Sequence, residues 1–385
     1  MELTARSCEA IGDGESLDTD ALQEAIDRCG EAGGGRVVLE PGTYLSGTLW
    51  LRSNVELHVA AGATLLGTTD PDLYEDCTAP GFKHGNAPEG NSRALLCASG
   101  ADNIAITGAG EINGSGPSFY DTDIRSDQRH YAKPDVPRPR MVIFYDCRDV
   151  RLEGTAFVDS PCWTIWLVAC ERVHVHRIRV RGDQRMINND GIDIDSCRDV
   201  TVSDSFFQTG DDCIVLRAIQ YMLEEEAVCE RVTVTNCVLD SWCQGIRIGV
   251  PSDNIIRHCV FSNLVIDGSG TGINIDNPRR YLHDDEGAMD LHDVMFSNIS
   301  INSGRWPIRI YVEEGVRLRR LSGITFSDIR ARGHRPLTVT GCEETILSDI
   351  TFSNVTVETE AEEPIVCRHC RGIRMNNVDF TTVNA

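Results

Sequence analysis

Residues 187–217 read INNDGIDIDSCRDVTVSDSFFQTGDDCIVLR and decide how the rest of the chain is interpreted. The stretch holds one acidic cluster that ends at Asp190 and a second at Asp211 and Asp212, each directly before a short β-type run, GIDI and CIVL. Aligning the runs places Asp190 and Asp212 in the same register, 22 residues apart. If 22 residues form one turn of a coiled sheet, the carboxylates lie on neighbouring strands, which are about 4.8 Å apart, and share a face.

The same short pattern recurs through the rest of the chain. After Val150, an alternating apolar run and a second short run return in DVTVSDSFF, RVTVTNCVL, DVMFSNISI and DITFSNVTV, with a period of about 22 to 40 residues. Strands that recur at this period without intervening helices predict an all-β fold, a solenoid of parallel β coils. A polar residue returns at the equivalent position of each repeat and predicts a hydrogen-bonded ladder. Its members are Asp204, Asn236, Asn298, Asp328, Asn354 and Asn377.

One amphipathic segment stands apart from the repeats. Residues 18–29 carry apolar side chains at helical spacing, with Asp18 as the expected N-cap and Gly30 as the expected stop. We expect this helix to cap the open end of the solenoid, because terminal repeats need a polar outer face. No linker divides the chain, so we predict a single domain, 1–385, with its cap at about 1–35. The irregular segment 120–140 is a candidate substrate loop and equally a solvated surface loop.

Composition and charge exclude several classes of function. The net charge of −23 argues against nucleic acid as a partner, because phosphates select basic surfaces. The sequence contains no run of about 18 apolar residues, so we expect no contact with a membrane. The first residues do not read as a secretory signal, so we expect a cytoplasmic protein unless a signal has been removed. The sequence leaves the oligomeric state open.

The cysteines follow the repeat. Four of them, Cys147, Cys170, Cys197 and Cys229, each precede by three residues a Val that opens a β run, and Cys370 precedes an Ile in the same way. We expect an internal stack of small, reduced side chains rather than disulfides. A zinc site is not expected, since the Cys-x2-Cys spacing of residues 367–370 has no partner pair.

The motifs together resemble glycoside hydrolase family 28, the polygalacturonase and rhamnogalacturonase family, whose fold is a right-handed parallel β-helix. The resemblance covers most of the chain, from VVLEPGTYLSGTLWLRSNVELHV through RPRMVIFYDCRDV, NNDGIDIDSC, GDDCIVLR and CQGIRIG. Family members carry Asn-x-Asp, Asp-Asp, Gly-His-Gly and Arg-Ile-Lys motifs on consecutive turns. Asn188-Asn189-Asp190 matches the first motif, and Asp211-Asp212 matches the second.

The resemblance implies catalytic roles for the aspartates. Asp211 would be the general acid that protonates the leaving oxygen, and Asp190 and Asp212 would activate the attacking water, with inversion at the anomeric carbon. Inverting sites hold acid and base about 6.5–9.5 Å apart. Consecutive strand residues point to opposite faces, so Asp211 and Asp212 can share a cleft only if the chain turns or bulges at Gly210. The alternative is that these acids bind Ca²⁺ or solvate a sheet edge.

The sequence departs from the family pattern at the substrate-binding motifs. Gln244 stands where the family has its His, and Asn274-Ile275-Asp276 stands where it has Arg-Ile-Lys. One turn further, Arg309-Ile310-Tyr311 keeps the Arg and replaces the Lys with Tyr. Arg247 and Arg309 would face outward beside the acids if the strands align. These departures favour a neutral or mixed oligosaccharide over polygalacturonate.

Aromatic residues on the same face are further candidates for sugar binding, because the apolar side of a sugar stacks on rings. Trp163, Trp242 and Trp306 align with the turns that carry the acids, although each could equally be a core residue or a loop anchor. We place Asn188 with them among the substrate-binding residues.

The sequence therefore predicts an inverting, exo-acting glycoside hydrolase that cleaves pectin-related or other plant-cell-wall oligosaccharides without a metal or organic cofactor. The partner is the oligosaccharide substrate, whose sugar the sequence leaves open between galacturonate and a non-galacturonate sugar. Two alternatives stay open: a β-helix lyase or epimerase acting on uronic acids, and a non-catalytic carbohydrate-binding β-helix.

Overall fold

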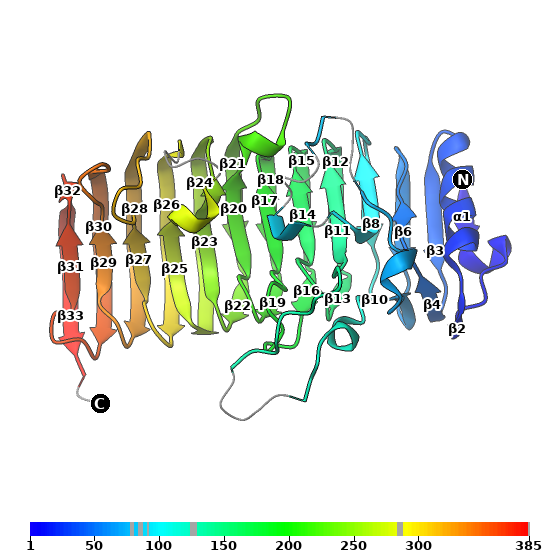
Figure 1. The fold of residues 1–385 in the computed structure, drawn as a ribbon, viewed down its shortest axis with the longest axis horizontal. Helices are drawn as coiled ribbons and strands as arrows, with labels where there is room; N and C mark the ends of the chain where they lie inside the picture. The colour runs from blue at the N-terminus through cyan, green and yellow to red at the C-terminus, as the bar shows by residue number, and fades with distance from the viewer. Residues whose placement is uncertain (78–80, 84–87, 91, 124–128, 283–287, 384–385) are drawn as a thin grey trace. The chain divides into compact units, whose positions relative to one another are not determined.

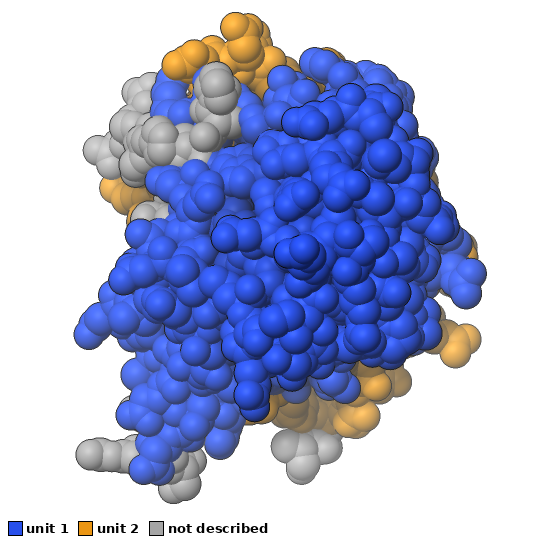
Figure 2. Space-filling model, turned by 90° about the vertical axis from the view of Figure 1, so that its right-hand side faces the viewer, with its two compact units in different colours: residues 1–192, 200–211 blue, residues 193–199, 212–385 orange. Residues whose placement is uncertain are grey.

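The computed structural model describes all residues except 78–80, 84–87, 91, 124–128, 283–287 and 384–385. Regular structure in the described residues is almost entirely parallel β-strand (Figure 1). This confirms the predicted all-β class and the right-handed parallel β-helix. The chain forms two compact units: unit 1 is residues 1–192 and 200–211, and unit 2 is residues 193–199 and 212–385 (Figure 2). The single domain 1–385 stays a prediction.

In unit 1 the described strands form three parallel ladders, one for each face of a coil. The first ladder contains β1 (Glu2–Thr4), β3 (Gly35–Leu39), β6 (Val55–Val59), β9 (Ala105–Thr107), β12 (Arg148–Glu153) and β15 (Glu171–His176). The second contains β2 (Asp13–Leu17), β4 (Gly42–Ser46), β7 (Ala63–Gly67), β10 (Glu111–Asn113), β13 (Ala156–Val158), β16 (Arg179–Arg181) and β19 (Phe206–Thr209). The third contains β5 (Leu49–Trp50), β8 (Ala94–Ser99), β11 (Arg140–Tyr145) and β14 (Ile165–Val168).

In unit 2 the first two faces merge into long strands. That ladder contains β21 (Cys229–Thr235), β22 (Val238–Ser241), β24 (Ile255–Ser269), β26 (Asp290–Ser303), β28 (Arg320–Gly333), β30 (Leu347–Thr359), β32 (Cys370–Arg371) and β33 (Arg374–Thr382). The remaining face contains β20 (Ile214–Ala218), β23 (Gln244–Ser252), β25 (Thr271–Asp276), β27 (Ile308–Tyr311), β29 (Leu337–Thr340) and β31 (Ile365–Arg368). Two strands, β17 (Ile192–Asp195) and β18 (Arg198–Ser203), contain residues of both units.

Helical turns punctuate the coils. The α-helix α1 spans Thr19–Glu31, one residue past the predicted stop at Gly30. Asp18 stands at its N-cap position but does not cap it, because its carboxylate accepts hydrogen bonds from the amides of Ile11 and Gly12 instead. The 3-10 helices are η1 (Ala5–Cys8), η2 (Pro71–Leu73), η3 (Pro88–Gly90), η4 (Gly116–Phe119), η5 (Gln220–Met222) and η6 (Arg279–Tyr281). No helix among the described residues is both long and apolar enough to cross a bilayer.

The predicted polar ladder sits at the sharp turn between the first and second faces. Every one of its members adopts a left-handed backbone conformation, with φ between 52° and 55°. Asn and Asp tolerate this conformation better than other non-glycine residues. Within unit 2 the amides also join successive turns: Asn354 Nδ2 donates to Asp328 Oδ1 at 3.0 Å, and Asn377 Nδ2 donates to Asn354 Oδ1 at 2.9 Å. The repeat of one residue type thus follows from one backbone conformation.

The core is built from columns of like side chains. In unit 2, Phe261, Phe296, Phe326 and Phe352 are fully buried and stack with ring centroids 4.8–4.9 Å apart and planes within 14° of parallel. The predicted cysteine stack is present as buried, free thiols at Cys147, Cys170, Cys197 and Cys229. The expectation that all cysteines are reduced is wrong at one place, since Cys77 and Cys97 form a disulfide. Neither of these cysteines belongs to the repeating column, so the repeat could not reveal the bridge.

The phenylalanine column predicts an uneven cost of mutation along one strand. Phe296→Ala should lower the free energy of unfolding by about 3–5 kcal/mol, because the ring is stacked on both sides and its removal leaves a cavity. The adjacent Met295→Ala, at a side chain 45% exposed, should change it by less than about 0.5 kcal/mol. Chemical denaturation measures both. Equal effects would contradict the stacked core.

Candidate active site

In unit 1 the two acidic motifs are hydrogen-bonded to each other. The side chain of Asn189 is 1% exposed, and its Oδ1 accepts the amide N–H of Gly210 at 2.8 Å and of Asp211 at 3.0 Å. The carboxylate of Asp211 in turn accepts the amide N–H of Asn188 at 3.1 Å. The Asn-x-Asp motif therefore fixes both the backbone and the carboxylate of Asp211, which is only half-buried, whereas Asp190 is 2% exposed.

Glycines make room for the Asn189 side chain. A Cβ on Gly210 would lie 2.2 Å from the carbonyl oxygen of Met186, and a Cβ on Gly182 would lie 2.5 Å from Nδ2 of Asn189. Glycine is therefore required at the predicted turn because the neighbouring backbone approaches closely. Its φ is not in the left-handed region, so backbone conformation is not the reason. Any larger residue at Gly210 would push the Asp211 backbone off its acceptor.

A buried arginine supports the first motif from the loop side. Arg138 is 4% exposed; its Nη2 donates to Asn188 Oδ1 at 3.0 Å, and its Nη1 donates to the carbonyl of Ile187 at 3.0 Å. The same guanidinium donates to the Tyr120 hydroxyl at 2.6 Å. Burial raises the pKa of Tyr120, so the phenol stays protonated and donates to the Ile187 carbonyl at 2.7 Å. The ends of the segment 120–140 therefore buttress Asn188, while residues 124–128 of this predicted substrate loop lie outside the described residues.

His130, in the same segment, lies close enough to Asp211 to interact with it electrostatically. Burial lowers the pKa of His130, Arg129 lowers it further, and Asp211 raises it. Sequence comparison of the turns could not indicate His130, because the residue comes from an irregular loop and not from the repeat. The signal available in the sequence was a His in the segment already marked as a candidate substrate loop.

Unit 2 places Asp212 beside Arg247, whose side chain is 12% exposed. Arg247 Nη1 lies 3.2 Å from Asp212 Oδ2, while its Nε and Nη2 lie 3.1 and 3.3 Å from the two oxygens of Asp276. Asp212 is 1% and Asp276 5% exposed. Burial alone would lower the pKa of Arg247, but the carboxylates of Asp276 and Asp212 hold it well above its usual value. The same interaction places a positive charge beside the buried carboxylate of Asp212.

On the next turn a second arginine, Arg309, lies on the other side of Asp276. Arg309 Nη1 lies 3.2 Å from Asn274 Oδ1 and 3.6 Å from Asp276 Oδ2. Burial lowers the pKa of Arg309, and its guanidinium lies over the Tyr311 ring, 4.2 Å from the centroid. The strand register explains the arrangement, since Arg247 pairs with Asn274, and Asn274 with Arg309.

These side chains line a pocket of about 230 Å³ in unit 2. Six of the residues predicted from sequence to bind substrate come together here: Gln244, Arg247, Asn274, Asp276, Trp306 and Arg309. The structure adds two cations that sequence reasoning missed, Arg280 and Arg305. Both lie outside the strands, on segments that no repeat position marks.

The other predicted aromatic residues are placed differently. Trp163 is 3% exposed and packs edge-on against Trp166, with the Arg140 guanidinium 4.7 Å from its ring centroid. A sugar ring has no access to it there, so the structure places Trp163 in the core. Trp242 is half-buried in the turn before β23 and does not line the pocket, and Tyr311 supports Arg309 from beside it.

A second buried ion pair in unit 2 was also missed. Asp193 and Arg217 alternate with core residues of β17 and β20, yet they are 0% and 5% exposed, with Arg217 Nη2 2.7 Å from Asp193 Oδ1. In sequence they look like ordinary outward-facing strand residues. Their burial shows that the outer face of this ladder is itself covered.

Fixed carboxylates beside the strands of a parallel β-helix, and a pocket that offers guanidinium groups and an indole, are features expected of the β-helix class of glycoside hydrolases. The chain belongs to a known family of that class. The profile described as "Glycosyl hydrolases family 28" matches residues 82–345, which include both acidic motifs and the pocket.

Individual relatives agree with this assignment. A "Probable polygalacturonase" of Vitis vinifera is 26% identical over 71% of this chain, which spans only 59% of that relative's length. An "Endo-polygalacturonase" of Pectobacterium carotovorum subsp. carotovorum is 23% identical over 92% of this chain and 88% of its own. Among solved structures, a hyperthermoactive exopolygalacturonase from Thermotoga maritima has the same fold, with a TM-score of 0.82 at 23% identity over 99% of this chain and 92% of that chain.

The Arg247 contacts predict a shift in pH dependence. Arg247→Met should lower kcat/KM by about 100-fold or more and move the acidic limb of its pH profile to higher pH, because Asp212 then ionises without a cation beside it. It should also lower the free energy of unfolding by about 3–5 kcal/mol. Asp276→Asn is the matched variant: it leaves the cation beside Asp212, so the limb should not move upward. An unmoved limb in Arg247→Met would show that the arginine does not set the ionisation of the acids.

Proposed function

We propose that the chain hydrolyses glycosidic bonds of pectin-related oligosaccharides with inversion at the anomeric carbon. The observation that carries the proposal is the tie between the two motifs, in which Asn189 and the amide of Asn188 orient Asp211. A general acid needs a fixed carboxyl with access to the leaving oxygen, and Asp211 is held on the backbone side while it stays half-buried. Asp190 and Asp212, which are almost fully buried, are the two carboxylates that we propose activate the attacking water.

The proposed substrate carries carboxylates. The pocket in unit 2 is lined by Arg247, Arg280, Arg305 and Arg309 against Asp276 and Glu313, so its arginines outnumber its acids. Arg247 is occupied by Asp212 and Asp276, whereas the exposed Arg305 lies at the pocket wall against Gly270. Guanidinium groups bind planar carboxylates with two parallel hydrogen bonds. The named relatives are polygalacturonases, and none of this supports the non-galacturonate sugar expected from the missing His and Lys.

The proposed mode of attack is exo. In unit 1, Glu89 accepts a hydrogen bond from Lys133 at 2.5 Å and lies 4.0 Å from Arg138. These contacts join the loop that contains Glu89 to the segment 120–140. Asn188 Nδ2 also donates to Glu89 at 3.4 Å. Loops joined over Asn188 would stop a polysaccharide chain from continuing past it, so a chain end would have to enter.

Substitution of the acids tests the mechanism. Asp211→Asn and Asp190→Asn should each reduce turnover of oligogalacturonate by several orders of magnitude, because they remove proton transfer while keeping side-chain volume. Asp328→Asn makes the same chemical change at a ladder position where other turns carry Asn, and should leave turnover unchanged. Reducing-end assays measure the rates, and ¹H NMR of the first product assigns its anomer. Undiminished turnover in both acid variants, or an unsaturated product, would reject inverting hydrolysis.

Substrate charge gives a separate test. Arg305→Gln should raise KM for oligogalacturonate by about 10–100-fold, the loss expected for a hydrogen bond to a charged group. The KM for the methyl-esterified oligomer should change much less, since that substrate lacks the carboxylate. Arg330→Gln, an exposed arginine outside the pocket, is the control. The same loss on both substrates would argue against carboxylate recognition by Arg305, and product sizing over time distinguishes single-unit release from internal cleavage.

A further inference from the structure

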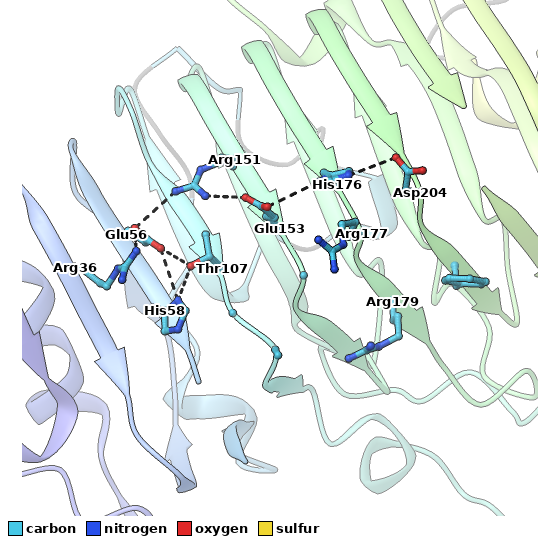
Figure 3. Close-up of a pocket in the computed structure, with 14 residues that line it drawn as sticks. Arg36, Glu56, His58, Thr107, Arg151, Glu153, His176, Arg177, Arg179 and Asp204 are labelled. Atoms are coloured by element: carbon cyan, nitrogen blue, oxygen red, sulfur yellow. Dashed lines mark hydrogen bonds and ion pairs between the residues drawn. The ribbon is translucent and has the colours of Figure 1, made fainter. Parts of the chain in front are cut away.

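Unit 1 contains a second and larger hollow on its first and second ladders. This groove has a volume of about 870 Å³ and is lined from β3, β6, β9, β12, β15, β16 and β19 (Figure 3). None of its lining residues comes from the third ladder, β5, β8, β11 and β14. The small residues Gly108, Ala109 and Gly154 leave the space open. The groove is therefore separate from the acidic motifs described above.

Two of the three carboxylates that line the groove are paired with arginines. Glu56 accepts hydrogen bonds from Arg36 Nη2 at 3.1 Å and from Thr107 Oγ1 at 2.5 Å (Figure 3). Burial alone would raise the pKa of Glu56, but Thr107 and Arg36 hold it below its usual value, so the group is ionised and paired. Glu153 is paired with Arg151 at 2.8 Å in the same way. These acids hold Arg36 and Arg151 in place, and the third carboxylate, Asp204, lies 3.4 Å from Nε2 of His176.

Two further arginines give the groove a surplus of positive charge. Arg177 and Arg179 are exposed, and no hydrogen bond or ion pair joins either of them to the other residues drawn in Figure 3. The groove thus offers Arg36, Arg151, Arg177 and Arg179 against Glu56, Glu153 and Asp204. This surplus stands in a chain of net charge −23, where a local basic site attracts anions against the overall field.

An exposed aromatic ring lies next to this charge. Phe206 is 57% exposed, and it is the lateral neighbour of Arg179, since the register of β16 and β19 pairs the two residues. Neighbouring strands are about 4.8 Å apart, so the two exposed side chains leave the sheet from adjacent positions on the same face. A pyranose that carries a carboxylate presents an apolar face, which suits an aromatic ring, and a planar anion, which suits a guanidinium. A neutral sugar would not use the arginines, and an inorganic polyanion would not use the ring.

We propose that this groove is a non-catalytic binding site for an acidic oligosaccharide, in which Phe206 stacks on a sugar and Arg177 and Arg179 bind uronate carboxylates. The choice of a uronate rests on the proposed function. The site would hold the protein on the polymer that it degrades, which favours repeated attack on one chain over attack on free short oligomers.

Binding without turnover tests the site. The full chain with Asp211→Asn is run in native gels that contain polygalacturonate, dextran or polyacrylate, and its retardation is measured. Added Arg177→Gln and Arg179→Gln should weaken the apparent affinity for polygalacturonate by at least tenfold, and added Phe206→Ala by at least threefold. Arg330→Gln with Arg332→Gln is the matched control, which removes the same charge from exposed positions of β28 outside the groove.

The outcomes separate this site from the proposed activity. Undiminished retardation in the groove variants, or equal loss in the β28 control, would overturn the groove as a binding site. Equal retardation by polyacrylate that persists in Phe206→Ala would show plain ion exchange and overturn sugar recognition. In the catalytically intact chain the groove variants should cleave short oligogalacturonates at the normal rate and polymer more slowly. If the intact chain hydrolyses nothing while groove binding holds, the proposed function fails and the groove stands.

Discussion

The in-register stacking of parallel strands is the constraint on which this structure depends. Each residue lies beside the residue at the same position of the next turn. Side chains at a buried position must therefore pack against the side chains at the equivalent position of the neighbouring turns. Phe261, Phe296, Phe326 and Phe352 meet this requirement with near-parallel rings. The same rule orders the outward side: Arg247, Asn274 and Arg309 form one column because their strands pair in register. Site chemistry here is a property of columns rather than of single loops.

The turns obey a second constraint of the same origin. A coil that bends at the same angle each time needs the same backbone conformation each time, and here that conformation is left-handed. Asn and Asp supply it at low cost, and their amides then reach the next turn. Because the geometry of the coil is secured by the core and by these turns, outward strand positions are free to carry charge. Both the pocket of unit 2 and the groove of unit 1 use that freedom.

The sequence was sufficient for the parts of the structure that repeat. The period, the polar ladder and the acid motifs all recur in register, so the fold and the strand ends that carry Asp190 and Asp211 could be predicted. Features that depend on side-chain paths between turns could not. The Cys77–Cys97 bridge lies outside the column, and Trp163 aligned with the acids but packs inward. The groove joins residues from 36 to 206, and no local motif marks it.

Asp276 shows why a change of residue type need not mean a loss of chemistry. At this position the family motif has a lysine, and an aspartate there suggested that the site had lost its cation. In the structure the cation comes from the preceding turn: Arg247 reaches Asp212 with one nitrogen and is held by Asp276 through two others. A single arginine between two carboxylates cannot turn away without leaving a buried charge unpaired, which makes it a more rigid neighbour for Asp212 than a lysine on a flexible stem. Asp276 therefore holds in place the arginine that supplies the positive charge. A carboxylate-bearing substrate remains compatible with the pocket, because other arginines that line it do not take part in the contact with Asp212.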